Sequence, residues 1–233
     1  MSPRLVLFDI DGTLVSAGGI SARVFGEALL EAFGTTGDAD RFDYSGKTDP
    51  QIVRELMTGA GFTDAEIEER RPRALEDYRV RLAASIRPEH VVPKPGMGLL
   101  LEALDRQPGV TLALLTGNLE PTARLKLQPV DANRFFPFGA FGSDDEDRYR
   151  LPRVALARAR EEVGVEFEGP DVVIVGDSIH DVRCGRDLGV RAVAVATGRT
   201  PAERLAESHP AALLPDFSDT PAAVAAILGR DGA

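Results

Sequence analysis

Two carboxylates separated by one residue follow a short apolar run near the start of the chain. Residues 5–8 are all apolar, and the next five residues are Asp9-Ile10-Asp11-Gly12-Thr13. Because strand side chains alternate, Asp9 and Asp11 are expected to share a face. One carboxylate can attack a phosphorus atom while its neighbour donates a proton and later takes one back. The competing interpretation is a turn or a helix cap, because Asp, Gly and Thr all favour turns.

Two later apolar runs also end in residues that suit this chemistry. Residues 110–115 lead into Thr116-Gly117-Asn118, and residues 172–175 lead into Gly176-Asp177-Ser178-Ile179-His180-Asp181. In a parallel sheet the carboxyl ends of neighbouring strands lie at one edge, where ligands bind. Asp177 and Asp181 are four residues apart, which places them on one face of a helical turn. The three segments are therefore expected to converge on a single site.

Several carboxylates in one site repel one another and favour a bound cation. At an effective dielectric constant of about 20, two like charges about 4 Å apart repel by about 4 kcal/mol. Oxygen ligands with few histidines or cysteines nearby suit Mg²⁺, which prefers one or two carboxylates, water and a substrate phosphate. We therefore expect Mg²⁺ as the cofactor.

The pattern of the remaining chain predicts the elements that hold these residues. Alternating strands and helices with turns between them are typical of a parallel α/β sheet flanked by helices. Residues 17–90 interrupt this alternation, because their periodic stretches are helical. We expect an α/β, Rossmann-like core made of residues 1–16 and 91–233, with an all-helical cap inserted at residues 17–90.

Within the inserted region the pattern predicts four helices. They cover residues 21–33, residues 51–59, a segment opened by the Thr63–Glu66 capping box, and residues 74–86. Asp49 is expected to cap the second helix, with Pro50 at the first helical position. Pro72 is expected to break the third helix, because proline lacks the backbone N–H that an interior position donates.

The composition excludes several classes of partner. Over 233 residues the formal net charge is −10 and the isoelectric point is near 4.9, whereas nucleic acids and anionic membranes need a basic surface. No apolar stretch approaches the 18 or so residues that cross a bilayer. The single cysteine, Cys184, leaves no internal disulfide and is typical of a reducing cytoplasm. We expect a cytoplasmic monomer or homodimer that binds neither nucleic acid nor membrane.

The order of these motifs resembles the haloacid dehalogenase (HAD) superfamily. The helical insertion directly after the first motif resembles the phosphoglycolate phosphatase-like branch of that superfamily. The resemblance implies that Asp9 is the nucleophile and that Asp11 is the general acid and base. It further implies that Thr116 holds the phosphoryl group. We expect Gly117 and Asn118 in the same phosphate site, where Asn118 could orient Thr116 or the nucleophile.

The same resemblance implies a magnesium site at the fourth motif. Asp177 matches a magnesium ligand of the family, and Asp181 matches its support or a second ligand. Asp9 and the backbone carbonyl of Asp11 complete the implied metal site.

The positive residue of the third motif has two candidates. The family usually places a lysine shortly before the helix that leads to the fourth motif, whereas this chain has Arg148 and Arg150 there. Either arginine could bridge a phosphate and a carboxylate while keeping its proton, and we slightly favour Arg148. In the inserted region, Lys47 lies in the loop Ser45-Gly46-Lys47-Thr48-Asp49. It could contact a phosphate or carboxylate of the substrate, or it could be an ordinary surface lysine.

We therefore expect a Mg²⁺-dependent phosphatase that hydrolyses a small phosphorylated metabolite, a phosphomonoester, through an aspartyl-phosphate. A sugar-phosphate mutase similar to β-phosphoglucomutase would keep both Asp9 and Asp11, so it stays open as an alternative. A non-catalytic binding protein on the same fold is the alternative from another class. The intact carboxylates argue against it, because a retired site has no reason to keep charges that repel one another.

Overall fold

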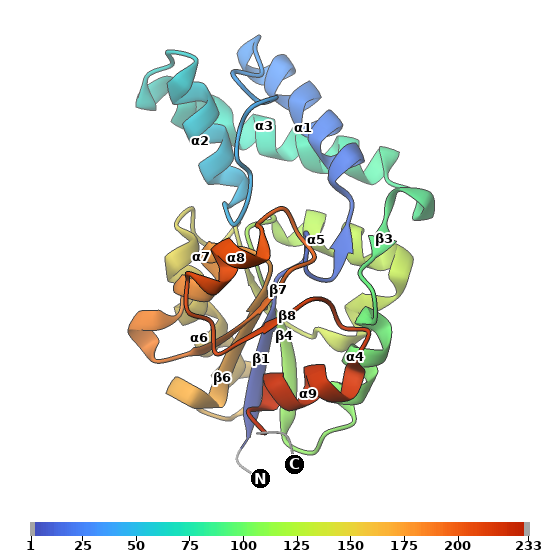
Figure 1. The fold of residues 1–233 in the computed structure, drawn as a ribbon. Helices are drawn as coiled ribbons and strands as arrows, with labels where there is room; N and C mark the ends of the chain where they lie inside the picture. Colours follow the sequence, from blue (N-terminus) through green and yellow to red (C-terminus); the bar gives the residue numbers. More distant parts are fainter. Residues whose placement is uncertain (1–2, 231–233) are drawn as a thin grey trace.

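The computed structural model describes residues 3–230 and contains a six-stranded sheet in which all pairs are parallel (Figure 1). The spatial order is β5-β4-β1-β6-β7-β8. The strands are β1 (Arg4–Phe8), β4 (Val110–Thr116), β5 (Gly139–Phe141), β6 (Val172–Gly176), β7 (Arg191–Val195) and β8 (Ala212–Leu214). This order confirms the predicted Rossmann-like α/β sheet.

Residues 5–8 of the central strand β1 are apolar because both faces of the strand are covered. Val6 and Phe8 are fully buried in the core on one face, and Leu5 and Leu7 are fully buried in a second core on the other face. Because successive side chains enter two apolar cores in turn, every residue of this run is apolar. A strand with one face in water would instead alternate apolar and polar residues. The run therefore fixes the position of Asp9 at the strand's carboxyl end.

Helices cover both faces of the sheet. The first core contains buried residues of α4 (Met97–Asp105), α5 (Glu120–Leu127) and α9 (Thr220–Leu228). The opposite face is covered by α6 (Leu151–Val163), α7 (Ile179–Arg183) and α8 (Ala202–Ala206). Short 3-10 helices lie at Pro88–His90, Gln128–Val130, Ala132–Phe135, Arg148–Arg150, Gly169–Asp171 and Arg186–Leu188. Across residues 3–230, every helix is too short or too polar to span a membrane.

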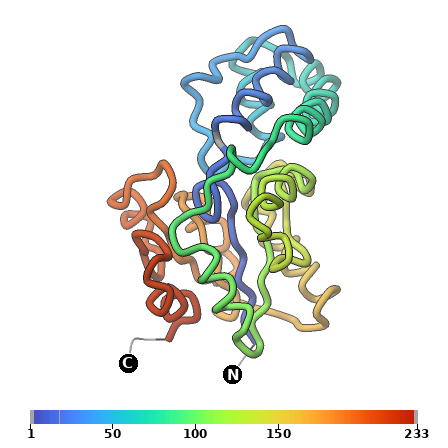
Figure 2. Tube along the Cα trace, turned by 90° about the vertical axis from the view of Figure 1, so that its right-hand side faces the viewer, coloured from blue at the N-terminus to red at the C-terminus, as the bar shows by residue number. Residues whose placement is uncertain are grey.

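Three helices form a separate group beyond the carboxyl edge of the sheet (Figures 1 and 2). They are α1 (Gly18–Phe33), α2 (Asp49–Gly59) and α3 (Asp64–Ser85), and both α1 and α2 pack against α3. The chain enters and leaves this group, hereafter the helical insert, through a short antiparallel ribbon. In that ribbon β2 (Val15–Ser16) pairs with β3 (Val92–Pro93). The sequence pattern did not predict the ribbon, because two-residue strands carry no periodicity.

The third helix of the insert differs from the prediction. It runs unbroken from Asp64 to Ser85 with Pro72 in its interior, so the expected break at Pro72 is wrong. Ile67 lies before the proline and Tyr78 after it, and both are buried against the rest of the insert. Packing along the whole face offsets a proline cost of about 3 kcal/mol, and Pro72 itself is exposed.

The start of α2 also differs from the prediction. Thr48 is the N-cap, and its side chain accepts a hydrogen bond from the backbone N–H of Gln51 at 3.2 Å. Asp49 is instead the first helical residue, and its carboxylate accepts a hydrogen bond from the backbone N–H of Leu119 in the sheet domain. Asp49 therefore does not cap α2, because its carboxylate binds the backbone of the sheet domain instead.

Candidate active site

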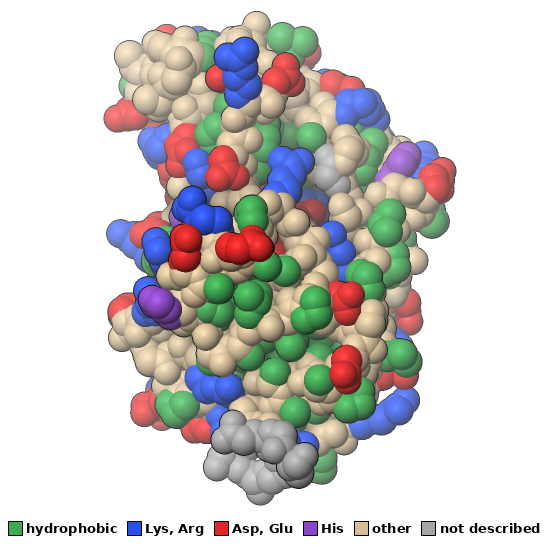
Figure 3. All heavy atoms as spheres, viewed as in Figure 1, with side chains coloured by type: hydrophobic (Ala, Val, Ile, Leu, Met, Phe, Trp, Pro, Cys, Tyr) green, Lys and Arg blue, Asp and Glu red, His purple; other side chains and the backbone are tan. Residues whose placement is uncertain are grey.

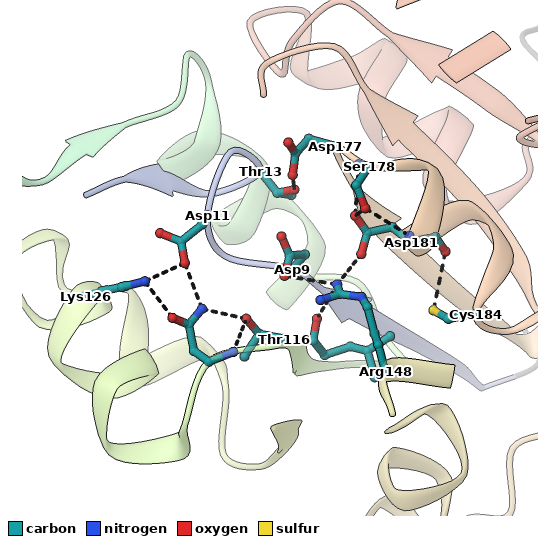
Figure 4. A network of polar contacts seen from close by, with 12 residues as sticks. Asp9, Asp11, Thr13, Thr116, Lys126, Arg148, Asp177, Ser178, Asp181 and Cys184 are labelled. Carbon is teal, nitrogen blue, oxygen red and sulfur yellow. Dashed lines mark hydrogen bonds and ion pairs between the residues drawn. The ribbon is translucent and has the colours of Figure 1, made fainter. Parts of the chain in front are cut away.

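The strand order brings the three predicted motifs together at one sheet edge. Strand β1 lies between β4 and β6, so Asp9 lies between Thr116, which ends β4, and Asp177, which follows β6. Figure 4 shows these side chains directed toward one another from the three strand ends. Thr116 and Asp177 are both almost completely buried.

Asp9 has an electrostatic environment unlike that of a surface carboxylate. It is only 7% exposed, and its backbone N–H donates to the carbonyl of Val175 at 3.0 Å. Burial raises the pKa of Asp9 to about 7; Arg148 opposes this shift, and the charges of Asp181 and Asp11 add to it. A carboxylate placed in this way is poorly solvated and available for reaction.

Arg148 is the arginine that reaches the carboxylates. It is 3% exposed and donates to Asp9 Oδ1 at 3.2 Å and also to Asp181 Oδ1. The side chain of Arg150 is 70% exposed and pairs with Asp145 on the surface. The structure thus brings Arg148, and not Arg150, into the site. The two residues occupy opposite sides of one short turn, which explains why the sequence alone left both open.

Three carboxylates could hold a metal ion. Asp9, Asp177 and Asp181 each offer one oxygen, and these three oxygens lie within 4.8 Å of one another. Burial raises the pKa of Asp177 well above its ordinary value, and the charges of Asp9 and Asp181 raise it further. A buried all-oxygen group with this much mutual repulsion fits a hard divalent cation such as Mg²⁺. The side chain of Asp11 lies outside this group.

The carboxylate oxygens of Asp181 accept more hydrogen bonds from the protein than those of Asp9 or Asp177. Its Oδ2 accepts from the backbone N–H of Ser178 at 3.0 Å and from the Ser178 hydroxyl at 2.6 Å, which forms the capping box of α7. Its Oδ1 accepts from Arg148. Among the residues that the structure describes, Asp177 by contrast accepts one hydrogen bond, from the Thr13 hydroxyl at 3.2 Å.

Asp11 belongs to a second polar network, on the other side of Asp9 (Figure 4). Its Oδ2 accepts from Lys126 Nζ at 2.6 Å and from Asn118 Nδ2 at 2.8 Å. The same Asn118 amide nitrogen donates to the Thr116 hydroxyl at 2.8 Å, and the Asn118 oxygen accepts from Lys126 at 2.6 Å. The structure therefore connects Asp11 to Asn118 and Thr116.

Lys126 was missed by the sequence analysis. It lies in α5 at the same helical spacing as the buried Ala123 and Leu127, so its stem lies on the inward face of the helix. That spacing could have identified Lys126 from the sequence, because a lysine on the inward face of a helix needs a buried partner. A lysine in a short helix is otherwise read as solvent-facing.

The loop before α2 lies directly over the site. The backbone N–H of Asp49 donates to the carbonyl of Gly117 at 2.8 Å, and Leu119 N–H donates to Asp49 Oδ2 at 2.9 Å. A Cβ at Gly117 would collide with the carbonyl oxygen of Lys47, so this close approach requires glycine. Burial raises the pKa of Asp49 to about 6, although Lys126 and the bond from Leu119 oppose the shift.

Lys47 lies in this loop, but its ammonium is already engaged. It pairs with Glu55 of α2 and lies 4.3 Å from the centre of the Phe42 ring. The Lys47 side chain nevertheless lines the cavity that the insert and the sheet domain enclose together. This cavity has a volume of about 330 Å³, and its wall also includes Asp9, Asp11, Thr116, Gly117, Asn118 and Arg148.

Comparisons with known proteins agree with this geometry. The sequence model of the family described as haloacid dehalogenase-like hydrolase matches residues 6–195. Phosphoglycolate phosphatase 1 of Pseudomonas aeruginosa is 30% identical, over 93% of this chain and 78% of its own length. Phosphoglycolate phosphatase of Agrobacterium fabrum is 29% identical, over 100% of this chain and 97% of its own length.

A solved structure supports the fold. The predicted phosphoglycolate phosphatase from Haemophilus somnus 129PT superposes with a TM-score of 0.71 at 21% identity, covering 96% of this chain and 99% of that one. The family match spans most of the chain, including the strands that end in Asp9, Thr116 and Asp177. The chain therefore belongs to the haloacid dehalogenase-like hydrolase family and is a phosphatase.

Proposed function

We propose that the chain hydrolyses a small phosphomonoester through an aspartyl-phosphate on Asp9, with Mg²⁺ as its cofactor. The observation that carries this proposal is the buried carboxylate of Asp9 in the wall of an enclosed cavity, bonded to Arg148 on one oxygen only. Phosphoglycolate is the first candidate substrate, because curated relatives of this chain bear the name phosphoglycolate phosphatase.

The nucleophile is Asp9 Oδ2. Arg148 bonds Oδ1, whereas Oδ2 accepts no hydrogen bond within residues 3–230. Attack by Oδ2 forms an oxygen–phosphorus bond while the bond from phosphorus to the leaving oxygen breaks. Arg148 keeps its proton and offsets charge on the transferring oxygens, together with the hydroxyl of Thr116 and the amides of Gly117 and Asn118.

Asp11 carries out the proton transfers. Its Oδ2 is occupied by Lys126 and Asn118, and its Oδ1 accepts no hydrogen bond in the part of the chain that the structure describes. The free oxygen protonates the leaving oxygen as the aspartyl-phosphate forms. It then takes a proton from the water that hydrolyses the intermediate, so Asp9 and Asp11 return to their starting states.

Asp9, Asp177 and the backbone carbonyl of Asp11 would hold Mg²⁺, with Asp181 as their support. When bound, the ion would supply positive charge to the phosphoryl oxygens and reduce repulsion among the carboxylates. The bonds of Asp181 to Ser178 and Arg148 favour the supporting role over that of a second ligand.

We further propose that residues 17–90 act as a cap on a core of residues 1–16 and 91–233. The ribbon between β2 and β3 connects the two, and the loop around Lys47 contacts the strand end at Gly117. Movement about the ribbon would admit substrate, and closure would exclude bulk water from the intermediate. Lys47 would contact the part of the substrate that leaves.

The remaining surface suits a small metabolite. Acidic and basic side chains are interspersed over the face in Figure 3, and the net charge of −10 disfavours nucleic acid and anionic membranes. Cys184 is a buried free thiol, and burial raises its pKa to about 12, so it is inert and needs no oxidising compartment. These features support a cytoplasmic setting.

The test is hydrolysis of p-nitrophenyl phosphate and of a panel of phosphomonoesters that includes phosphoglycolate. Activity should require Mg²⁺, disappear with EDTA and be lost in Asp9→Asn, while Asp105→Asn on an exposed helix end serves as the matched control. Intact-mass measurement should trap a transient phosphate on the wild-type chain and none on Asp9→Asn. A phospho-enzyme that persists in water would favour the mutase, and full activity in Asp9→Asn would refute the proposal.

A further inference from the structure

Lys126 is a buried cation that the proposed reaction does not otherwise employ. Its side chain is 5% exposed, and burial alone would lower its pKa. The carboxylate of Asp11, the Tyr78 hydroxyl and the Asp49 carboxylate raise the pKa of Lys126 above its ordinary value on balance. The Lys126 ammonium lies 2.6 Å from Asp11 Oδ2, and Asp11 is the largest influence that opposes burial.

The contacts of Lys126 determine how its neighbours are oriented. An ammonium group can only donate hydrogen bonds, so the amide oxygen of Asn118 must face Lys126, at 2.6 Å. The amide nitrogen of Asn118 must then face the other way, where it donates to Asp11 and to the Thr116 hydroxyl. Without Lys126 the Asn118 oxygen would lose this contact, and the amide would be held less firmly toward Asp11.

The same contacts give the two carboxylate oxygens of Asp11 different environments. Lys126 and Asn118 both bond Oδ2, at 2.6 and 2.8 Å. The Asp11 side chain is still 39% exposed toward the cavity, so its other oxygen stays accessible to a bound molecule. One oxygen is thus fixed to the protein and the other is left for the proton.

We propose that Lys126 is a positioning residue that holds Asp11 and Asn118 so that Asp11 Oδ1 delivers the proton to the leaving oxygen. This inference rests on the proposed function. In the step concerned, Asp9 Oδ2 bonds to phosphorus, the bond from phosphorus to the leaving oxygen breaks, and the proton of Asp11 Oδ1 moves to that oxygen. Lys126 also lines the cavity, but in this proposal it acts through Asp11 and Asn118.

A positioning role predicts that the effect of Lys126 depends on the leaving group. p-Nitrophenol leaves readily as an anion and needs little protonation, whereas phenol needs more and an alkyl alcohol needs most. A misplaced proton donor therefore slows alkyl phosphates strongly, phenyl phosphate less and p-nitrophenyl phosphate least. A variant that merely loosens the fold would slow all three by the same factor.

The experiment compares kcat/KM for these three substrates in the wild type and in Lys126→Met, which keeps the length of the stem. We expect about a 100-fold loss with an alkyl phosphate and less than about a threefold loss with p-nitrophenyl phosphate, since a positioned acid supplies about 10²–10⁴-fold. Arg124→Met is the matched control: it removes a cation from the same helix that bonds the carbonyl of Phe136. If Lys126→Met does not fold, Lys126→Gln provides the same comparison.

A double-mutant cycle with Asp11→Asn separates positioning from direct binding. If Lys126 acts through Asp11, Lys126→Met causes no further loss with phenyl phosphate in the Asp11→Asn background. A loss that persists there, or equal losses for all three leaving groups, would overturn the inference. Failure of the proposed function is distinguishable, because it would appear as full activity in Asp9→Asn or as a wild type inactive on all phosphomonoesters, and the inference would then fall with it.

Discussion

Replacing Arg148 with methionine should harm both the stability and the activity of this phosphatase. Arg148 Nη2 lies 3.2 Å from Asp9 Oδ1, and at an effective dielectric constant of about 20 two unit charges at that distance attract by about 5 kcal/mol. The substitution leaves Asp9 and Asp181 buried without their cation, and breaking such a buried pair costs about 3–5 kcal/mol.

The expected loss is large enough for calorimetry. For a chain of this size about 1 kcal/mol corresponds to about 2–4 °C in Tm, so Arg148→Met should lower Tm by about 6–20 °C. Its kcat/KM for p-nitrophenyl phosphate should fall by about 10²–10³, because the proposed mechanism loses one charged donor to the phosphoryl group. Arg150→Met is the matched control two residues away. Its side chain is 70% exposed, so its stability should change by less than about 0.5 kcal/mol.

The comparison of the two arginines can refute the assignment. Equal Tm values for Arg148→Met and the wild type would mean that the buried ion pair does not stabilise the site. A loss of activity in Arg150→Met larger than in Arg148→Met would mean that the exposed arginine contacts the phosphate in the closed enzyme.

Two further predictions concern carboxylates between the insert and the sheet domain. Bonds from Arg54, and then Arg71, lower the pKa of Glu146, so its stabilising effect is present above its ordinary pKa and is lost as the pH falls through the lowered value. Glu146→Gln should therefore cost about 1–2 kcal/mol at neutral pH, and its Tm should approach the wild-type Tm in acid. Burial raises the pKa of Asp49 to about 6, so the wild type loses stability as the pH rises from about 4 to about 6. Asp49→Asn should gain up to about 3 kcal/mol relative to the wild type over that range, and a pH-independent difference in Tm would contradict this.

The parts of the fold that local sequence determines were predictable. The apolar residues of strands β1 and β6 are buried on both faces of the sheet, and the residues after these strands therefore lie at the sheet edge. Thr63 and Glu66 form the predicted capping box, because each side chain bonds the backbone of the other within one turn. These features depend on neighbours in the chain, which a sequence displays directly.

The predictions that were wrong or missing concern features that depend on residues far away in the chain. Pro72 does not break α3, because packing on both sides of it outweighs the lost hydrogen bond. Asp49 does not cap α2, because a backbone N–H from the sheet domain binds its carboxylate. The role of Lys126 requires knowing that α5 turns its inner face toward Asp11, a residue 115 positions earlier. Tertiary contacts of this kind leave no periodic signal.

The distribution of charge around the site indicates where a cation would bind. Arg148 bonds Asp9 and Asp181, and Lys126 bonds Asp11 and also faces Asp49. Asp177 forms no ion pair within residues 3–230, and its hydrogen bond from Thr13 is neutral. A Cβ at Gly12 would lie 2.6 Å from the carboxyl carbon of Asp177, so the chain also passes too close for a side chain there. The four other carboxylates share two protein cations, whereas Asp177, beside Asp9, has none within hydrogen-bond distance in the described residues. A divalent cation at that point would reduce the negative charge at the place where a phosphoryl group must approach the nucleophile.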